Sequence, residues 1–451
     1  MREIRLHDTR RGEVVALEPR TPGEVGIYAC GPTVYARIHI GNARPFVVYS
    51  LLKRFLEHEG LQVTFVSNIT DVNDKIYDAA ARARPPVPSA QLAREMAAAY
   101  VADTDRLGLG RPDHEPLAGE TIGPIIDLID ALIERGSAYA AEGDVYFRVR
   151  TDPRYGELSH RAVDDMDQGE GLEGAARKED PLDFALWKAQ KPGEDTAWDA
   201  SWGRGRPGWH IECSAMAEEL LGVGFDIHGG GNDLVFPHHE NEAAQTRMGR
   251  GAELARIWMH NGMLQLSGEK MAKSVGNITP LGEALDTWGR DALVLFFSTG
   301  HYHQPLQFSD ETLAQAQASV RRIRDAGRRL RSGDSPADLE PLRERFFDAL
   351  ADDFNTPRAL AALYEWIGEA NKREGVGDAH AREMLAVLGL ENLLDAGAGE
   401  QPDEQARALL DAREAARAAR DWAEADRLRD ALVALGWEVR DSAAGPELVR
   451  R

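Results

Sequence analysis

The feature that most constrains the fold is an alternation of strand-like and helix-like segments near the start of the chain. A hydrophobic run at residues 25–30 is followed by an amphipathic run at 43–58 and then by a second hydrophobic run at 62–67. This order is typical of a βαβ unit, whose two strands lie parallel in one sheet. The sequence therefore predicts an α/β fold built on a parallel sheet.

The rest of the chain predicts further domains. Its 451 residues exceed what one hydrophobic core usually organises. Residues 151–206 are rich in glycine, proline and charge and have weak periodicity, so we expect an insertion there. Strong patterning resumes at 209–308, and helical periodicity follows beyond it. A linker containing glycine and proline at 395–402 and a short strand at 437–441 complete the expected order.

The overall charge limits the kinds of partner. With 53 Lys+Arg against 75 Asp+Glu, the net charge is -22, which weighs against a partner held by bulk positive charge. A polyanion would have to bind local basic patches. The N-terminus has no apolar run behind a basic start, and no stretch approaches the roughly 18 apolar residues of a membrane span. We therefore expect a cytoplasmic protein without membrane contact.

The only two cysteines, Cys30 and Cys213, rule out a disulfide framework and leave buried thiols, one redox pair or a metal or catalytic role. His238 and Glu242 are four residues apart at the start of an expected helix, so they share one face. Both residue types ligate zinc, and with the cysteines they make a four-ligand set possible. Two buried free thiols and a histidine at a helix start would explain the same residues.

Two further segments have features of phosphate sites. Residues 30–42 follow a buried strand and precede a helix, where Gly41 allows close approach and His39 and Asn42 could donate hydrogen bonds to phosphate oxygens. Lys270 and Lys273 lie in a glycine-flanked stretch that could close over a triphosphate. An ordinary strand-to-helix loop and a pair of solvated lysines are the respective alternatives.

A third segment, residues 225–233, runs from a strand into consecutive glycines that include Gly230. Such a loop allows a nucleotide to lie against the backbone, and Asp233 could accept hydrogen bonds from ribose hydroxyls. A flexible surface turn is the alternative.

The order and spacing of these motifs closely resemble the cysteinyl-tRNA synthetases, which are class I aminoacyl-tRNA synthetases. The resemblance begins at Tyr28 and rests on residues 30–42, 68–71, 208–213, 225–233, 237–242 and 270–274. It implies a Rossmann-type catalytic domain in two halves, 1–118 and 207–262, interrupted by a connective insertion at 119–206. It also implies a stem-contact region with the lysine loop at 263–315, an all-α tRNA-binding bundle at 316–395 and a small α+β anticodon-binding domain at 403–451.

The resemblance further implies one zinc ion and a set of binding residues. The zinc ligands would be Cys30, Cys213, His238 and Glu242, with the thiolate of the substrate cysteine on the same metal. Sulfur is a soft ligand that suits zinc and a serine hydroxyl is a much poorer one, so the metal could replace an editing domain. Residues Thr70, Trp209 and His228 would line the amino-acid pocket. At the end of the chain, Arg417, Trp422 and Asp426 would lie around the anticodon.

The reaction implied is attack of the cysteine carboxylate on the α-phosphate of ATP, release of pyrophosphate and transfer of cysteine to the 3′ end of tRNA(Cys). His39 and Asn42 would act at the α-phosphate and Lys270 and Lys273 at the transferred and leaving phosphates, with Mg²⁺ bridging them. Gly41, Gly230 and Asp233 would complete the ATP site. A monomer is expected.

Two other functions fit part of the sequence. One is a related ligase that joins cysteine to an amino sugar in thiol-cofactor synthesis, but such relatives lack the C-terminal anticodon module. The other is a non-catalytic paralogue, against which the intact His39, Asn42, Lys270 and Lys273 speak. A basic surface for tRNA is expected where four arginines recur at helical spacing, namely Arg321, Arg324, Arg328 and Arg331. A solvated helix face would show the same pattern.

Overall fold

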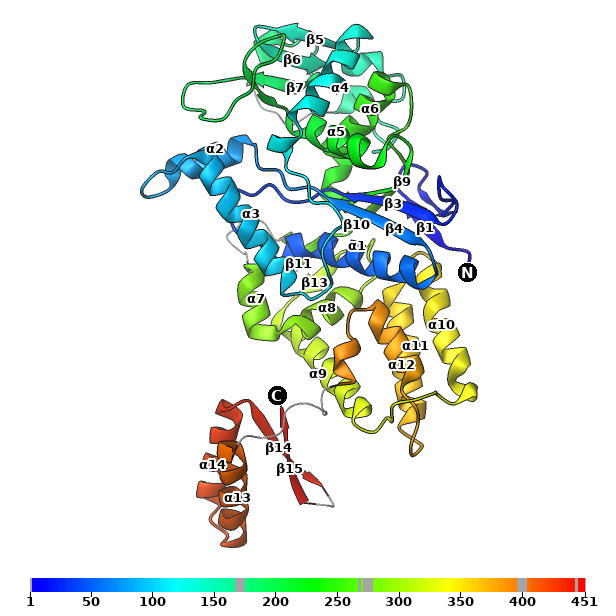
Figure 1. Ribbon diagram of the computed structural model, residues 1–451, viewed down its shortest axis with the longest axis vertical. Coiled ribbons are helices and arrows are strands. Elements are labelled where there is room, and N and C mark those ends of the chain that lie inside the picture. The colour runs from blue at the N-terminus through cyan, green and yellow to red at the C-terminus, as the bar shows by residue number, and fades with distance from the viewer. Residues whose placement is uncertain are drawn as a thin grey trace. The chain divides into compact units, whose positions relative to one another are not determined.

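The computed structural model describes residues 2–166, 175–266, 269–270, 279–395, 404–442 and 445–450. The chain forms two compact units, residues 1–391 and 392–451 (Figure 1). Among the helices of the described ranges, none has both the length and the apolar composition needed to cross a membrane.

A four-stranded parallel sheet lies at the centre of the first unit and confirms the predicted α/β fold. Its strand order is β10 (Ala255–Asn261), β9 (Phe225–Gly231), β3 (Glu24–Ala29), β4 (Gln62–Ser67). Ile27 pairs with Ile227 on one side and with Phe65 on the other, so β3 is an inner strand. The helix between β3 and β4 is α1 (Ile40–His58), which begins three residues before the amphipathic run that predicted it.

The glycine run belongs to this sheet and is neither a flexible turn nor an open loop. Gly229 and Gly230 lie within the buried strand β9. A Cβ at Gly229 would lie 2.3 Å from the ring of Tyr49, and one at Gly230 would lie 2.8 Å from the ring of His239. Glycine is therefore required here because neighbouring rings occupy the space of a side chain.

The insertion forms an antiparallel sheet above the parallel one, coloured cyan to green in Figure 1. Its strands are β5 (Ala138–Ala141), β6 (Asp144–Phe147), β7 (Phe184–Ala189) and β8 (Gly205–Pro207), in that spatial order. The apolar face of this sheet shares a core with three helices, namely α4 (Ile122–Glu134), α5 (Trp209–Leu221) and α6 (Glu240–Arg250). An arm of two helices, α2 (Asp74–Arg82) and α3 (Ser89–Asp105), precedes it.

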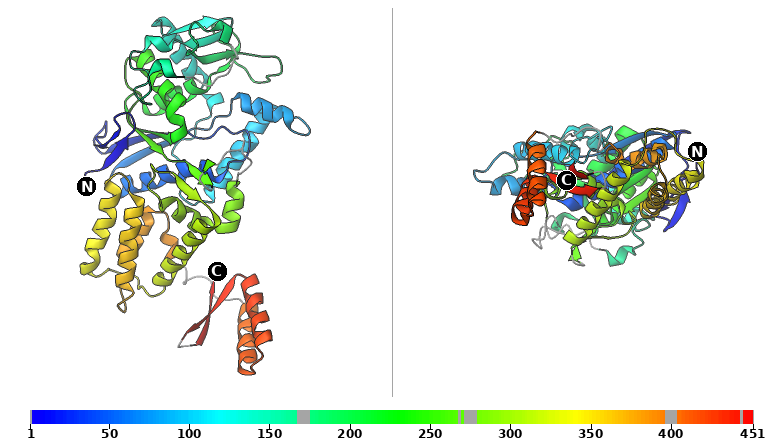
Figure 2. Two further views of the ribbon diagram at one scale, coloured as in Figure 1. Left: turned by 180° about the vertical axis from the view of Figure 1, so that it is seen from behind. Right: turned by 90° about the horizontal axis from the view of Figure 1, so that it is seen from below.

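A small mixed sheet and a set of helices follow the parallel sheet. The mixed sheet has the order β12 (Glu269–Lys270), β11 (Leu264–Leu266), β13 (Leu306–Phe308). Three of the helices lie beside one another (Figure 2). The helices are α7 (Leu281–Trp288), α8 (Arg290–Ser298), α9 (Asp310–Gly327), α10 (Glu340–Ala351), α11 (Thr356–Ala370) and α12 (Ala379–Val387), of which the last three form this group.

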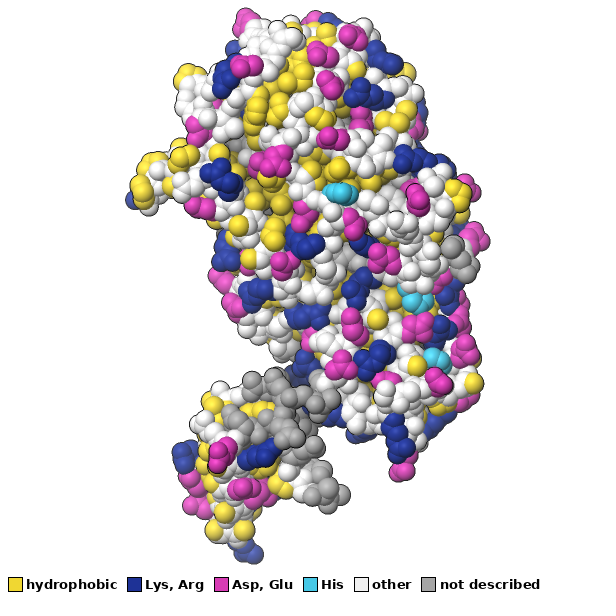
Figure 3. Space-filling view, in the orientation of Figure 1, with side chains coloured by type: hydrophobic (Ala, Val, Ile, Leu, Met, Phe, Trp, Pro, Cys, Tyr) yellow, Lys and Arg dark blue, Asp and Glu magenta, His cyan; other side chains and the backbone are white. Residues whose placement is uncertain are grey.

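The proposed arginine stripe does not form one helical face. Helix α9 ends at Gly327, so Arg328 is its C-cap residue and Arg331 lies beyond it. Arg324 donates a hydrogen bond to Asp291 at 2.6 Å. Acidic and basic side chains are mixed over the face of the first unit seen in Figure 3.

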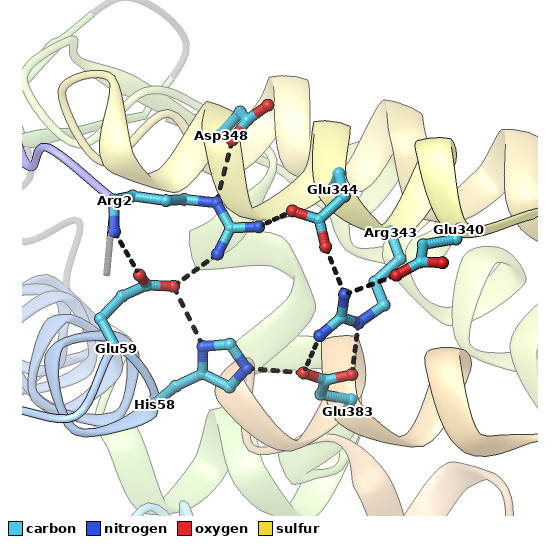
Figure 4. A network of polar contacts seen from close by, with 8 residues as sticks. All are labelled: Arg2, His58, Glu59, Glu340, Arg343, Glu344, Asp348 and Glu383. Carbon is cyan, nitrogen blue, oxygen red and sulfur yellow. Dashed lines mark hydrogen bonds and ion pairs between the residues drawn. The ribbon is translucent and has the colours of Figure 1, made fainter.

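A network of eight charged or titratable side chains joins the start of the chain and the end of α1 to α10 and α12 (Figure 4). We call it the bundle network; its members are Arg2, His58, Glu59, Glu340, Arg343, Glu344, Asp348 and Glu383. The N-terminal hairpin of β1 (Arg5–Asp8) and β2 (Glu13–Ala16) follows Arg2.

The second unit has its own small core. Helices α13 (Glu404–Ala418) and α14 (Trp422–Ala434) pack against each other, and the hairpin of β14 (Trp437–Ser442) and β15 (Gly445–Arg450) follows them. Ala406, Leu432 and Trp437 are buried between these elements. The predicted terminal strand is thus one half of a hairpin.

Candidate active site

A pocket of about 400 Å³ opens at the carboxyl ends of the parallel strands. The residue that follows β3 and the last residues of the other three strands line it: Cys30, Ser67, Gly231 and Asn261. His39, Gly41 and Asn42 line it from the start of α1. Ligands of open α/β sheets bind at this edge, and the N-terminus of α1 favours an anion there.

Four predicted metal ligands meet beside this pocket. One donor atom from each of Cys30, Cys213, His238 and Glu242 lies within 4.8 Å of the others, and all four side chains are buried. The Sγ atom of Cys30 is 3.6 Å from Nε2 of His238 and 3.6 Å from Oε1 of Glu242. The same imidazole nitrogen is 2.9 Å from that carboxylate oxygen. Since Cys30 also lines the pocket, a cation held here would face it.

Each of the four donors comes from a different structural context. Cys30 follows β3, Cys213 lies on α5, His238 precedes α6 and Glu242 lies in the first turn of α6. The backbone is kinked at Phe236, which precedes both residues. His238 and Glu242 therefore lie one turn apart after the kink, and their side chains meet as the spacing predicted.

Charges within this cluster shift the pKa values of its members. Burial lowers the pKa of His238, but Glu242 and Cys213 outweigh burial and raise it to about 10. A hydrogen bond from Cys30 lowers the pKa of Cys213 to about 6, whereas burial raises the pKa of Cys30. The cluster therefore favours a thiolate at Cys213, the form in which sulfur ligates a metal.

A second donor group shares two members with the first. His228 and His239 join Cys30 and Glu242 in a buried set that satisfies the same distance limit. Nε2 of His239 is 3.3 Å from Sγ of Cys30, and its Nδ1 is 2.7 Å from Nε2 of His260. No role for His239 or His260 was predicted from the sequence, although the consecutive histidines at 238–239 were a signal for His239.

The other predicted pocket residues divide into two groups. Trp209 and Asp233 line the pocket, and the Trp209 ring stacks on His238 at 4.2 Å. Thr70, His228 and Gly230 do not line the pocket. Asn68 donates a hydrogen bond to Thr70 at 3.2 Å, and Nε2 of His228 contacts Glu242 at 2.8 Å. In place of Gly230, its neighbour Gly231 reaches the pocket.

The lysine segment is described only in part. Lys270 lies on β12, where it pairs with Gln265 of β11. Lys273 lies outside the described residues.

In the second unit, the three residues predicted near an anticodon lie on either side of the turn between α13 and α14. Arg417 is in the last turn of α13, and Trp422 and Asp426 are one helical turn apart on α14. The Trp422 side chain is 60% exposed, so it does not pack in the core of this unit.

Comparisons with known protein families agree with this architecture. Residues 16–318 match the catalytic domain of class I (C) tRNA synthetases, residues 345–395 match the DALR domain, and residues 401–445 match the anticodon-binding domain of cysteinyl-tRNA ligases. The anticodon-domain match does not favour the amino-sugar ligase.

Individual relatives give the same result. A cysteine–tRNA ligase of Pseudothermotoga lettingae is 42% identical, and one of Alkalilimnicola ehrlichii is 45% identical, each over 98% of both chains. Among solved structures, the Mycobacterium tuberculosis methionyl-tRNA synthetase with methionyl-adenylate has a TM-score of 0.60 at 18% identity, covering 82% of this chain and 89% of its own. That likeness shows the shared fold. The chain belongs to the cysteine–tRNA ligase family of class I aminoacyl-tRNA synthetases.

Proposed function

We propose that this cysteine–tRNA ligase selects its amino acid with a zinc ion held by Cys30, Cys213, His238 and Glu242. The observation that carries the proposal is the meeting of these four buried donors beside the pocket. Two sulfurs, one imidazole nitrogen and one carboxylate oxygen are a ligand set that zinc prefers. Because the four side chains are buried, a bound cation would offset the cost of burying their negative charge. When bound, zinc supplies a soft Lewis acid that ligates a substrate thiolate and discriminates against the hydroxyl of serine.

The residues of the chain have separate tasks in this proposal. Trp209 packs on His238 and limits the size of the amino-acid side of the pocket, with Thr70 and His228 supporting it. His39 and Asn42 donate hydrogen bonds to the α-phosphate, where charge grows as the cysteine carboxylate attacks and pyrophosphate leaves. Asp233 accepts hydrogen bonds from the ribose of ATP.

Lys270 and Lys273 neutralise the transferred and leaving phosphates together with Mg²⁺ that arrives with ATP. Catalysis is then a matter of position and charge, because the carboxylate is already ionised and needs no base. After activation, cysteine moves to the 3′ end of tRNA(Cys).

The roles outside the pocket rest on the domain order. The helices at 316–395 would bind tRNA, and Arg417, Trp422 and Asp426 would read the anticodon, for which the exposure of Trp422 leaves an aromatic surface for base stacking. We place the enzyme in the cytoplasm as a monomer.

The deciding experiment is cysteine-dependent exchange between ATP and pyrophosphate, followed by charging of purified tRNA(Cys). We expect exchange with cysteine, at least about 10⁴-fold weaker exchange with serine, and charging. Absence of exchange would overturn the activation chemistry. Exchange without charging would favour transfer to a small amine, as in the amino-sugar ligase. Zinc content measured on the same preparation tests the metal independently.

A further inference from the structure

One side of the pocket carries a cation to which the proposed function gives no task. This side includes Tyr35, Arg37 and Lys75, all of which line the pocket. Arg37 forms an ion pair with Asp103 at 2.9 Å, so its charge is already balanced. Lys75 is exposed, and among the residues that the structure describes no carboxylate forms an ion pair with it. Lys75 is therefore available to an anion that enters the pocket.

Two contacts orient Lys75. Its Nζ lies 5.8 Å from the centre of the Tyr35 ring, whose face attracts a cation. Its backbone N–H donates to the side chain of Asn73 at 3.1 Å, and this residue caps the start of α2. Both contacts hold Lys75 at the pocket, and neither neutralises its charge.

Helix α2, which carries Lys75, is fixed to the insertion and lies next to it in Figures 1 and 2. The carboxylate of Asp74 accepts a hydrogen bond from Arg206 of β8. The hydroxyl of Tyr77 donates to the carbonyl of Thr196 at 3.0 Å. The residues on both sides of Lys75 thus hold the helix on the insertion, and a side chain on a fixed helix is placed more precisely than one on a loop.

The order of the strands separates Lys75 from the residue proposed for the ribose of ATP. Asp233 follows β9 and Lys75 follows β4, and β3 lies between these two strands. Cys30 comes directly after β3 and so lies between the two residues. In the proposed function, an adenylate held between Asp233 and the metal at Cys30 occupies the β9 side of the pocket. The Lys75 side is then open to the next substrate.

The next substrate of a cysteine–tRNA ligase is the 3′ end of tRNA, which must reach the adenylate while the adenylate is still bound. This end is a single strand, and the phosphate of its last nucleotide is the anion nearest to the reacting hydroxyl. Lysine binds such phosphates as a point charge and thereby positions the strand. Because the chain has a net charge of -22, its overall field repels a polyanion, and a local cation is needed at the point of entry.

We propose that Lys75 binds the phosphate of the last nucleotide of tRNA and guides the 3′ end to the adenylate from the β4 side of the pocket. The proposal rests on the proposed use of this pocket for cysteine and ATP, and it concerns the transfer step alone. Tyr35 and Asn73 orient the lysine, and Asp74 fixes its helix against the insertion.

The test compares full-length tRNA(Cys) with the same tRNA without its terminal adenosine and the attached phosphate. Both are bound to enzyme loaded with an unreactive analogue of cysteinyl-adenylate. Lys75→Gln should bind the full-length tRNA about fivefold more weakly than the wild type, as expected for loss of an exposed ion pair. The shortened tRNA should bind both proteins equally, because it lacks the phosphate. For the full-length tRNA, the slope of log Kd against log salt should fall by about 0.7, which corresponds to one lost contact with a single strand.

Two further variants control for charge. Lys75→Arg keeps a cation and should bind the full-length tRNA within about twofold of the wild type, since both residue types bind phosphates. The matched control is Arg82→Gln on the same helix, because the Arg82 side chain is 81% exposed and pairs with Asp78. It should bind both tRNAs as the wild type does. Cysteine-dependent ATP–pyrophosphate exchange without tRNA should keep its kcat and its KM for ATP in all three variants.

Three results would overturn the proposal: wild-type binding of full-length tRNA by Lys75→Gln, an equal loss for both tRNAs, or a raised KM for ATP in the exchange reaction. The third result would assign Lys75 to the triphosphate. Absence of exchange in the wild type would instead overturn the proposed function, so the two failures are distinguishable.

Discussion

Two histidine–glutamate pairs in this molecule have nearly the same geometry and different surroundings. Nε2 of His238 lies 2.9 Å from Glu242 beside the pocket, and Nε2 of His58 lies 2.8 Å from Glu383 in the bundle network. The first pair has side chains that are 2% and 0% exposed, whereas the second pair has side chains that are 21% and 32% exposed. The contact alone therefore does not reveal a function.

The surrounding charges distinguish the two pairs. At Glu383, Arg343 supplies a permanent cation with a hydrogen bond from its Nε at 2.5 Å. At Glu242, the favourable charges come from His238 and His228, and two cysteine sulfurs are close by. In the described part of the chain, the buried cluster around Glu242 holds sulfur and carboxylate donors without an arginine or lysine beside them, which favours a bound metal ion. In the bundle network, arginine side chains neutralise the carboxylates. Substitutions in the metal cluster and in the bundle network should therefore have different effects on zinc content and on stability.

The largest effect is expected from Cys213→Ser. A serine hydroxyl is a poor zinc ligand, so stoichiometric zinc should be lost, with an affinity more than about 100-fold weaker than in the wild type. The ratio of kcat/KM for cysteine to that for serine should fall as zinc is lost. Metal analysis and exchange assays measure both, and Ser214→Ala is a control on the same helix. Wild-type zinc and selectivity in Cys213→Ser would show that the ligand set is wrong.

The next effect separates the two overlapping donor groups. His238→Ala should lose zinc as Cys213→Ser does, because it removes a ligand. His239→Ala should keep stoichiometric zinc but bind it about 10- to 100-fold more weakly, because its imidazole contacts Cys30 from behind the pocket. Titration with a competing chelator measures both affinities. The opposite order would assign the metal to the group that contains His228 and His239.

Much of the fold could be predicted from the sequence because its signals are local. Residues 62–67 form β4 with the expected bounds, and hydrophobic periodicity identified α1. Strands β7 and β8 of the insertion sheet were missed because they are short and are separated by long irregular stretches, so no period stands out. The glycine run was misinterpreted because the rings of Tyr49 and His239 leave no space for side chains there. These rings come from distant parts of the chain.

The candidate site divides in the same way. Its motifs carry chemically distinctive residues at short spacing, so Cys30, His238 and Glu242 could be grouped by type and by family resemblance before their meeting was observed. Lys75 and His260 could not be identified. Lys75 lies in the first turn of a short helix, and the sequence does not tell which face of that helix turns toward the pocket. His260 contacts His239 with one ring nitrogen and Thr9 with the other, and both partners are distant in sequence.

The smallest effect is expected from Glu383→Gln in the bundle network. Burial raises the pKa of Glu383, but hydrogen bonds from Arg343 and His58 outweigh it and lower the pKa from 4.5 to about 2. A lowered carboxyl pKa stabilises the fold above pH 4.5, and this stabilisation is lost as the pH falls toward 2. Because solvent screens this partly exposed side chain, we expect a loss of only about 1 kcal/mol at pH 7.

This loss corresponds to a melting temperature lower by about 1 to 2 °C in a unit of this size. The difference from the wild type should narrow between pH 4.5 and the lowest pH at which both proteins remain folded, while zinc content stays unchanged. Glu365→Gln removes an exposed partner of Arg345 and serves as the control that should not shift the melting temperature. If Glu383→Gln behaves like this control at pH 7, or if it releases zinc, the bundle network is not the self-balanced counterpart of the metal cluster, and the contrast between the two histidine–glutamate pairs fails.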